Sequence, residues 1–341
     1  MFEIGTSPDT REYARSTCIS SPLSHSVSVL SLRRHIQTMI SILLPTYNFD
    51  PSDTVKELHS QCSELNISFE ILIADDDPES RMESVHRELS TLGNVIATIN
   101  PHNLGRRENR DNLASKARYE YLLFLDEDAV ITHRSFIKNY LNVLKPGVVV
   151  CGGVDYCSTL PLSEKKKLRY RYGLRSEVKA ASDRNSAPYN SFITFNFLIS
   201  KEIYLKLPRH QEIVGYGHED TLMGYDLKYM FVPILHIDNT ACHSQIDSNE
   251  VYVKKTKEAL ENLSRMISTG KIDEDVQMYK AFSRLRTVGF HVVLRLLYSL
   301  FGKELERYIS TSNPALWIFD LYRLMYLSYI QPQMTTPGAW K

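Results

Sequence analysis

The sequence lacks several features that would assign a chain of 341 residues to a class at once. It has no excess charge, because 40 basic residues balance 40 acidic ones, so we expect no nucleic-acid partner. No apolar run reaches the roughly 18 to 20 residues needed to cross a bilayer. The N-terminal region has acids, many serines and no long apolar core, so we also expect no signal peptide.

Cysteine is scarce as well. The five cysteines are too few and too scattered for a disulfide framework, and no pair has zinc-finger spacing. We therefore expect reduced thiols and a cytoplasmic protein. The cysteines are Cys18, Cys62, Cys151, Cys157 and Cys242.

Apolar residues make up 43% of the chain, which is enough for a large core, and length alone suggests about two domains. Residues 1–38 are polar and serine-rich, so we expect a poorly ordered arm there. Buried-strand patterns then occur at about 40–48, 69–74, 95–99 and 121–125, with helical patterns between the first three. This alternation predicts an α/β fold with a parallel, doubly wound sheet.

Acidic residues follow two of these strands, at Asp75–Asp77 and at Asp126–Asp128. Ligands of open α/β sheets collect at the carboxyl ends of the strands, so both sets are predicted to border one crevice. Two carboxylates one residue apart can hold a hard cation. The alternative is an acidic, solvated turn, because so short a motif also occurs by chance.

The second half of the sequence is less regular. Strands are expected at 148–153, 191–199 and 235–238, and helices at about 134–144, 221–227 and 249–266. Residues 156–190 are expected to be irregular. Their basic cluster at 165–175 is either a solvated face or a contact for a lipid-linked diphosphate or a membrane. The apolar helical tail at 273–330 either packs on the catalytic body or a second subunit, or lies in a membrane interface.

Five motifs in this order resemble those of the family 2 glycosyltransferases. The resemblance covers about residues 39–265 and implies a GT-A fold, which is a Rossmann-like, mostly parallel sheet flanked by helices. It revises the expected organisation to an N-terminal arm (1–38), one catalytic domain (39–265) and a helical C-terminal extension (266–341). The motifs are Ile42–Asn48, Ala74–Asp76, Asn103–Arg106, Asp126–Asp128 and Gly217–Asp220.

The resemblance implies a divalent cation, Mn²⁺ or Mg²⁺, held by Asp126, Asp128 and His243. Such a cation stabilises the charge on a leaving nucleoside diphosphate as a Lewis acid. An imidazole ligand suits Mn²⁺ better than Mg²⁺. Glu127 is expected to be a spacer that points away, and His243 has the alternative of being an ordinary histidine at a strand end.

The family pattern also implies a site for a nucleoside-diphosphate sugar, for which we expect a UDP-linked donor. Tyr47 can stack on the base, Asp76 can accept from a base N–H, and arginine forks suit the diphosphate. Asp111 stands where the family often has asparagine, which puts the detail of that contact in question. The expected donor-binding residues are Pro45, Thr46, Tyr47, Asp76, Arg106, Arg110, Asp126 and Asn196.

Asp220 and Glu219 match the family's acidic pair near the acceptor. Inverting transfer needs a base for the acceptor hydroxyl, and we assign Asp220 as that base and Glu219 as the residue that orients the acceptor. The structural alternative is a pair of acids at a helix N-terminus. The expected acceptor is a hydroxyl of a growing glycan or a lipid-linked acceptor, met in the cytoplasm or at the inner face of the cell membrane.

Two competing functions remain. A sugar-phosphate nucleotidyltransferase would want a glycine-rich loop with a basic residue after the first strand, where this chain has Pro45–Asn48. A non-catalytic sugar-nucleotide-binding or scaffold protein would have no need of the base at Asp220.

Overall fold

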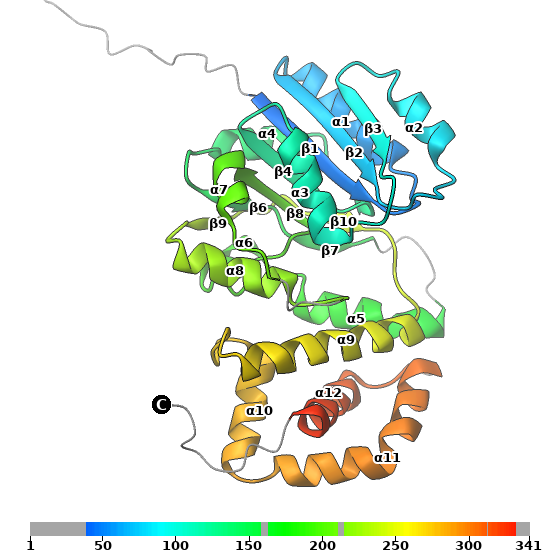
Figure 1. Cartoon of the computed structure of the whole chain (residues 1–341), viewed down its shortest axis with the longest axis vertical. Coiled ribbons are helices and arrows are strands. Elements are labelled where there is room, and N and C mark those ends of the chain that lie inside the picture. The colour runs from blue at the N-terminus through cyan, green and yellow to red at the C-terminus, as the bar shows by residue number, and fades with distance from the viewer. Residues whose placement is uncertain (1–38, 158–162, 211–214, 312, 332–341) are drawn as a thin grey trace, which may run out of the picture. The chain divides into compact units, whose positions relative to one another are not determined.

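The computed structural model describes residues 39–157, 163–210, 215–311 and 313–331 of the chain. The expected arm at 1–38 and Cys18 lie outside these residues. In the described part, a large sheet carries helices on both sides, and four further helices follow toward the C-terminus (Figure 1).

The large sheet has seven strands in the order β3-β2-β1-β4-β8-β6-β9. Only β8 runs antiparallel to its neighbours β4 and β6, so the mostly parallel sheet predicted from the sequence is confirmed. Its strands are β1 (Met39–Thr46), β2 (Ser68–Asp75), β3 (Val95–Ile99), β4 (Tyr121–Leu125), β6 (Val149–Cys151), β8 (Asn196–Ser200) and β9 (Ile234–His236).

Alternate side chains of the central strands enter two different cores. Ile42 and Leu44 of β1 belong to one apolar cluster, whereas Leu43 between them belongs to another. The first cluster also contains side chains from α1 (Ser52–Glu64), α2 (Glu83–Leu89) and α4 (Phe136–Val143). The second contains side chains from α3 (Arg106–Lys116), α7 (Lys201–Lys206) and α8 (Glu219–Tyr229). A strand buried on both faces reads as a continuous apolar run, as β1 and β4 do.

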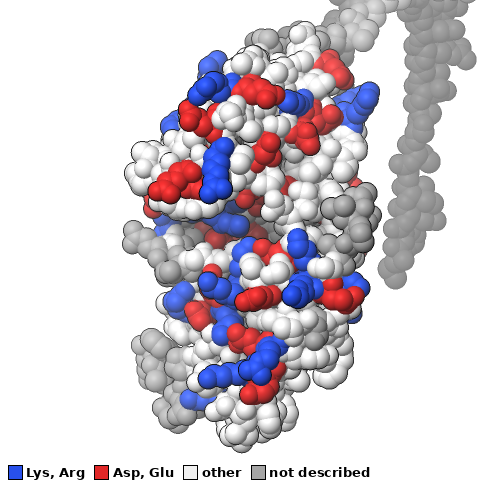
Figure 2. All heavy atoms as spheres, turned by 90° about the vertical axis from the view of Figure 1, so that its right-hand side faces the viewer, with Lys and Arg blue, Asp and Glu red and all other residues white. Residues whose placement is uncertain are grey.

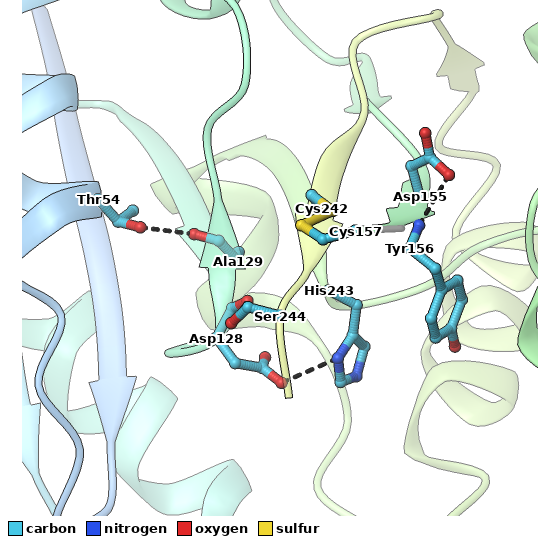
Figure 3. Close-up of a disulfide and its surroundings, with 9 residues drawn as sticks. All are labelled: Thr54, Asp128, Ala129, Asp155, Tyr156, Cys157, Cys242, His243 and Ser244. Carbon is cyan, nitrogen blue, oxygen red and sulfur yellow. Dashed lines mark hydrogen bonds and ion pairs between the residues drawn. A yellow bond between two sulfur atoms is a disulfide. The ribbon is translucent and has the colours of Figure 1, made fainter. Parts of the chain in front are cut away.

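A small second sheet joins distant parts of the chain. Its order is β5-β10-β7, with β5 at Ala129–Val130, β7 at Val154–Tyr156 and β10 at Ala241–His243. Because β7 and β10 run parallel, Cys157 and Cys242 come within 5.5 Å between Cα atoms and form a disulfide (Figure 3). The expectation of reduced cysteines is therefore wrong for this pair, although Cys62 and Cys151 are buried free thiols.

The segment expected to be irregular contains two helices, α5 (Lys167–Ser176) and α6 (Ala181–Asn185), after a short 3-10 turn at Glu164–Lys166. Its basic side chains are mostly engaged within the protein. Arg171 donates to Asn313 Oδ1 (2.8 Å), and Arg175 forms a 2.9 Å ion pair with Asp320. Part of the basic cluster thus holds the C-terminal helices, which was neither of the two uses foreseen for it.

The predicted helical tail is present as α10 (Gln277–Thr287), α11 (His291–Thr311) and α12 (Leu316–Ile330), which follow α9 (Asn249–Ser268). Leu222 of α8, Leu263 of α9 and Leu327 of α12 share one apolar cluster, so the tail packs on the catalytic body. None of the helices among the described residues is long and apolar enough to span a membrane.

Candidate active site

A cavity of about 650 Å³ opens at the carboxyl ends of β1 and β4. Loops after these strands and the first turns of α3 and α8 form its wall, as expected for an open α/β sheet. The structure brings nearly all sequence-predicted site residues to this cavity. They are Pro45, Thr46, Tyr47, Asp76, Arg106, Arg110, Asp126, Asp128, Glu219, Asp220 and His243.

Asn196 is the exception and corrects the prediction that it binds the donor. Its side chain is fully buried and does not border the cavity. The amide nitrogen donates to Gly153 O (3.1 Å) and Asn239 O (2.9 Å), and Oδ1 accepts from the Tyr140 hydroxyl (2.6 Å). Asn196 therefore uses its polar atoms to tie together the loops beneath the site.

Asp126, the first acid after β4, lies against a buried arginine. Arg110 Nη2 donates to Asp126 Oδ1 over 2.6 Å. Burial alone would lower the pKa of Arg110, but the Asp126 carboxylate outweighs it and the pKa is raised. The Nε atom of Arg110 is buried without a hydrogen-bond partner. A cationic fork with a free buried donor, in a cavity wall, is suited to an anionic ligand.

Glu127 is not the outward-pointing spacer expected from the sequence. It borders the cavity, and its Oε2 accepts from the backbone N–H of Tyr47 over 2.6 Å. Burial raises the pKa of Glu127 to about 7. This contact joins the acidic turn after β4 to the turn after β1.

Asp128 and His243 face each other across the small sheet (Figure 3). The distance from His243 Nδ1 to Asp128 Oδ2 is 3.0 Å, and this buried nitrogen has no partner with hydrogen-bond geometry. Parallel stacking on Tyr156 and Phe195, at 5.4 and 5.3 Å between centroids, fixes the plane of the imidazole. Burial raises the pKa of Asp128, although His243 opposes the shift.

The three expected metal ligands do not come together as one set. Among the described residues, no three His, Cys, Asp or Glu side chains are grouped closely enough to hold a metal ion. The reason is that Asp126 turns to Arg110, which leaves Asp128 and His243 as a pair. A carboxylate oxygen beside an imidazole nitrogen without a hydrogen bond is still a donor pair that suits Mn²⁺.

One side of the cavity is shaped by Asp76, the acid directly after β2. Asp76 Oδ1 accepts from Leu104 N (2.8 Å), and Oδ2 accepts from Gly105 N (2.7 Å), so the carboxylate holds the loop before α3. Gly105 has a φ of 85°, which permits this turn into the helix. Thr46 Oγ1 is a buried polar atom without a partner in the wall of the cavity.

Asp220 lies in the first turn of α8, and its Oδ1 accepts from Thr194 Oγ1 (2.6 Å) and Thr194 N (3.2 Å). Burial raises the pKa of Asp220 to about 6 despite these hydrogen bonds. Glu219 Oε2 accepts from Gly217 N over 3.0 Å, so it serves as a local cap as well as part of the cavity wall.

Sequence reasoning missed a buried group on α5 at the same cavity. Arg169 forms two hydrogen bonds with Glu177, of 2.9 and 3.1 Å, and lies between the rings of Tyr156 and Tyr252. The Tyr156 hydroxyl also donates to Glu177 Oε2 over 2.6 Å. Arg169 lies in a run of lysines and arginines, and no signal in the sequence distinguishes it from the solvated members of that run.

Comparison with known proteins adds to this geometry. Residues 41–207 match the family described as Glycosyl transferase family 2. This region belongs to glycosyltransferase family 2. The glycosyltransferase is similar in fold to mannosyltransferase PcManGT from Pyrobaculum calidifontis, with a TM-score of 0.52 and 13% identity over 85% of each chain. The likeness to a solved GT-A glycosyltransferase agrees with the predicted fold.

Two further solved structures have lower similarity. Mannosyl-3-phosphoglycerate synthase from Rubrobacter xylanophilus has a TM-score of 0.48 and 14% identity over 69% of this chain and 76% of its own. Glucosyl-3-phosphoglycerate synthase from Mycobacterium tuberculosis has a TM-score of 0.45 and 16% identity over 67% of this chain and 79% of its own. No functionally curated protein sequence matches this glycosyltransferase.

Proposed function

We propose that this glycosyltransferase transfers a sugar, with inversion, from a nucleoside-diphosphate donor to a hydroxyl of a glycan or lipid-linked acceptor. The observation that carries the proposal is a single cavity that is lined by a buried arginine, Arg110, beside Asp126 and by a half-buried carboxylate, Asp220. The arginine suits binding of the departing diphosphate, and Asp220 suits removal of the proton from the acceptor hydroxyl.

Two unpartnered polar atoms support a nucleotide in the donor half. Thr46 Oγ1 and Arg110 Nε are both buried in residues that line the cavity. Buried polar atoms rarely stay unpaired, so a ligand that supplies acceptors would satisfy them. Tyr47 is 54% exposed beside them and is free to stack on a base. We propose a UDP-linked donor. The Pyrobaculum protein, by contrast, is described in complex with GDP-Man and Mn²⁺.

We propose that Asp128 and His243 hold a divalent cation, Mn²⁺ or Mg²⁺, with Asp126 nearby. When bound, such a cation would offset the negative charge that develops on the leaving nucleoside diphosphate. The protein's own contribution is to orient the two metal-ligating side chains. Stacking fixes the imidazole of His243, and a hydrogen bond from Ser244 N to Asp128 O (3.0 Å) fixes the backbone of Asp128. Arg110 would remain to bind phosphate oxygens.

Asp220 is proposed to accept the proton of the acceptor hydroxyl as its oxygen attacks the anomeric carbon. A general base works best when its pKa lies near the operating pH, and burial brings the pKa of Asp220 to about 6. The hydrogen bonds from Thr194 fix one carboxylate oxygen and leave the other for the acceptor. Glu219 is proposed to orient the acceptor beside it.

The proposed place of action is the cytoplasm, at the inner face of the cell membrane. Reduced cysteines no longer support it, because Cys157 and Cys242 are joined. Any support must come instead from the surface of the C-terminal helices, which is described below.

Donor binding and transfer can be measured separately. The purified protein would be tested with UDP-, GDP- and dTDP-sugars and Mn²⁺ or Mg²⁺, by thermal stabilisation and by release of nucleoside diphosphate. Asp220→Asn is expected to retain stabilisation by the donor and to lose at least about 100-fold in release or transfer rate. The control is Glu202→Gln, which changes an exposed acid at the same place in another helix, α7.

Three results would contradict parts of this proposal. Unchanged turnover in Asp220→Asn would remove Asp220 as the base. Donor binding without turnover in the wild type, across the acceptors tried, would favour the non-catalytic sugar-nucleotide-binding protein. Release of pyrophosphate from a nucleoside triphosphate and a sugar phosphate would favour a nucleotidyltransferase.

A further inference from the structure

One face of α11 exposes a row of apolar side chains. Val292, Leu296 and Leu300 follow one another at four-residue spacing, which places them on one side of the helix, and Leu296 and Leu300 are 58% and 59% exposed. Just before the helix, Val288 and Phe290 are exposed at the corner between α10 and α11. The other exposed apolar residues here are Val293 and Phe301.

The opposite side of α11 is already occupied. Leu294, Gly302 and Ile309 are buried there, and Ile309 shares an apolar cluster with Phe319 and Tyr322 of α12. In Figure 1, α11 lies on the side of α9 that faces away from the large sheet. The helix is thus apolar on two sides, and among the described residues nothing buries the outer one. Single exposed apolar residues such as Leu205 are ordinary, but a contiguous exposed row is typical of an interaction surface.

The charge along this row is mainly basic, and the exposed acid Glu304 follows at its C-terminal end. From residue 277 to residue 303 there are five basic residues and no aspartate or glutamate, in a chain with a net charge of zero. None of the five forms an ion pair with another described residue. On the face drawn in Figure 2, acidic and basic side chains are mixed together. The five residues are Lys280, Arg284, Arg286, Arg295 and Lys303.

We infer that the outer face of α11, with the α10–α11 corner, docks on an anionic lipid surface. An amphipathic helix whose apolar row is bordered by lysine and arginine has the chemistry of an interfacial membrane helix. Arg284 and Arg286 lie in the last turn of α10, immediately before the apolar corner at Val288 and Phe290. Insertion of that corner would bring both arginines to the level of the lipid phosphates.

Charge also argues against a second copy of the chain as the partner. A two-fold contact through α11 would face the same surface on both copies, and the basic residues of one would meet those of the other. The acids of α11 are Glu304, at the end of the row, and Glu306, which pairs with Lys257, so the five basic residues outnumber them. Anionic lipid supplies both the apolar medium and the opposite charge. The evidence for this surface is independent of the proposed function. Its biological use rests on that function, since a lipid-linked acceptor would be met at such a surface.

The test is co-sedimentation of the full chain with vesicles of phosphatidylcholine alone or with about one third phosphatidylglycerol. We expect binding to the anionic vesicles, weaker binding to the neutral ones, and loss of binding as salt is raised. Leu296→Glu combined with Leu300→Glu is expected to weaken binding at least about tenfold, because it places two anions in the apolar row.

The matched control is Leu205→Glu combined with Phe231→Glu, which adds the same charge at residues that are 55% and 89% exposed on the catalytic domain. The inference is wrong if the wild type ignores anionic vesicles, or if the control loses as much binding as the α11 variant. It is also wrong if light scattering shows a dimer that only the α11 variant disrupts, without a change in vesicle binding. Donor-induced thermal stabilisation, measured on the same samples, reports on the proposed function independently.

Discussion

The ion pair between Glu177 and Arg169 allows a quantitative prediction about the free energy of unfolding. The pair could not be identified from the sequence, so the prediction tests the structure itself. Glu177→Gln keeps the shape of the side chain and removes its charge, which leaves the buried guanidinium of Arg169 without an anion. Breaking a buried ion pair in this way costs about 3–5 kcal/mol. The Glu177 side chain is 30% exposed and glutamine retains one acceptor oxygen, so we expect about 2 kcal/mol.

The measurement is urea-induced unfolding of the wild type, Glu177→Gln, Arg169→Gln and the double variant. The two single changes should not add, and a coupling of about 1–2 kcal/mol is expected for groups that share hydrogen bonds. Additivity within about 0.5 kcal/mol would refute the view that the pair stabilises the fold as a unit.

The pH dependence of the same variant provides a second check with a definite sign. Burial would raise the pKa of Glu177, but Arg169 outweighs it and the pKa is lowered. A carboxyl whose pKa is depressed by folding contributes stability above its unfolded pKa of about 4.3, and that stability is lost as the pH falls through the folded value. The difference between wild type and Glu177→Gln should therefore be full at neutral pH and shrink below about pH 4.

Three other predictions concern the cavity. If Asp220 is the base, kcat/KM should rise with pH through about 6, where burial sets its pKa, and a flat profile between pH 5 and 8 would contradict this. His243→Ala should weaken Mn²⁺ binding about 10- to 100-fold in calorimetry while the far-ultraviolet circular dichroism is unchanged, and equal affinity would remove His243 as a ligand. Gly217→Ala should lower the midpoint of urea unfolding, because Gly217 has a φ of 103° and an added Cβ would lie 2.5 Å from that of Ala259. A stable variant with an unchanged midpoint would show that the turn before α8 is not fixed.

The parts of the fold that could be predicted from the sequence are those with a local signature. Strands such as β1 and β4 are buried on both faces and read as uninterrupted apolar runs, and β3 was predicted with its observed bounds, Val95–Ile99. The acids after β2 and β4 were expected at one crevice because parallel strands end at the same edge. Their individual roles were not predictable in this way, as Glu127 shows by binding the backbone of Tyr47.

The parts that escaped prediction are set by contacts between distant segments. Helix α5 buries Arg169 as well as Leu168, so its inward face lacks the apolar period that identifies a helix. Asn196 is polar, as a ligand-binding residue would be, but only the structure shows that its amide nitrogen donates to Gly153 O and Asn239 O. Strands β7 and β10 have three residues each, and their pairing, which unites Cys157 with Cys242, leaves no trace in the sequence around either one.

The small sheet affects the order in which the enzyme folds during synthesis. Its middle strand, β10, carries His243 and is made long after β5, with which it pairs beside Asp128. Pairings between segments so remote in the chain form slowly, because a large loop must close first. During synthesis, the parallel strands of the early half are therefore expected to pair before β10 is made. The acidic turn at Asp126–Asp128 then lacks His243 until β10 pairs with β5. The region that matches the family, 41–207, contains neither Asp220 nor His243, so expressing that region alone would yield a scaffold without its proposed base or imidazole.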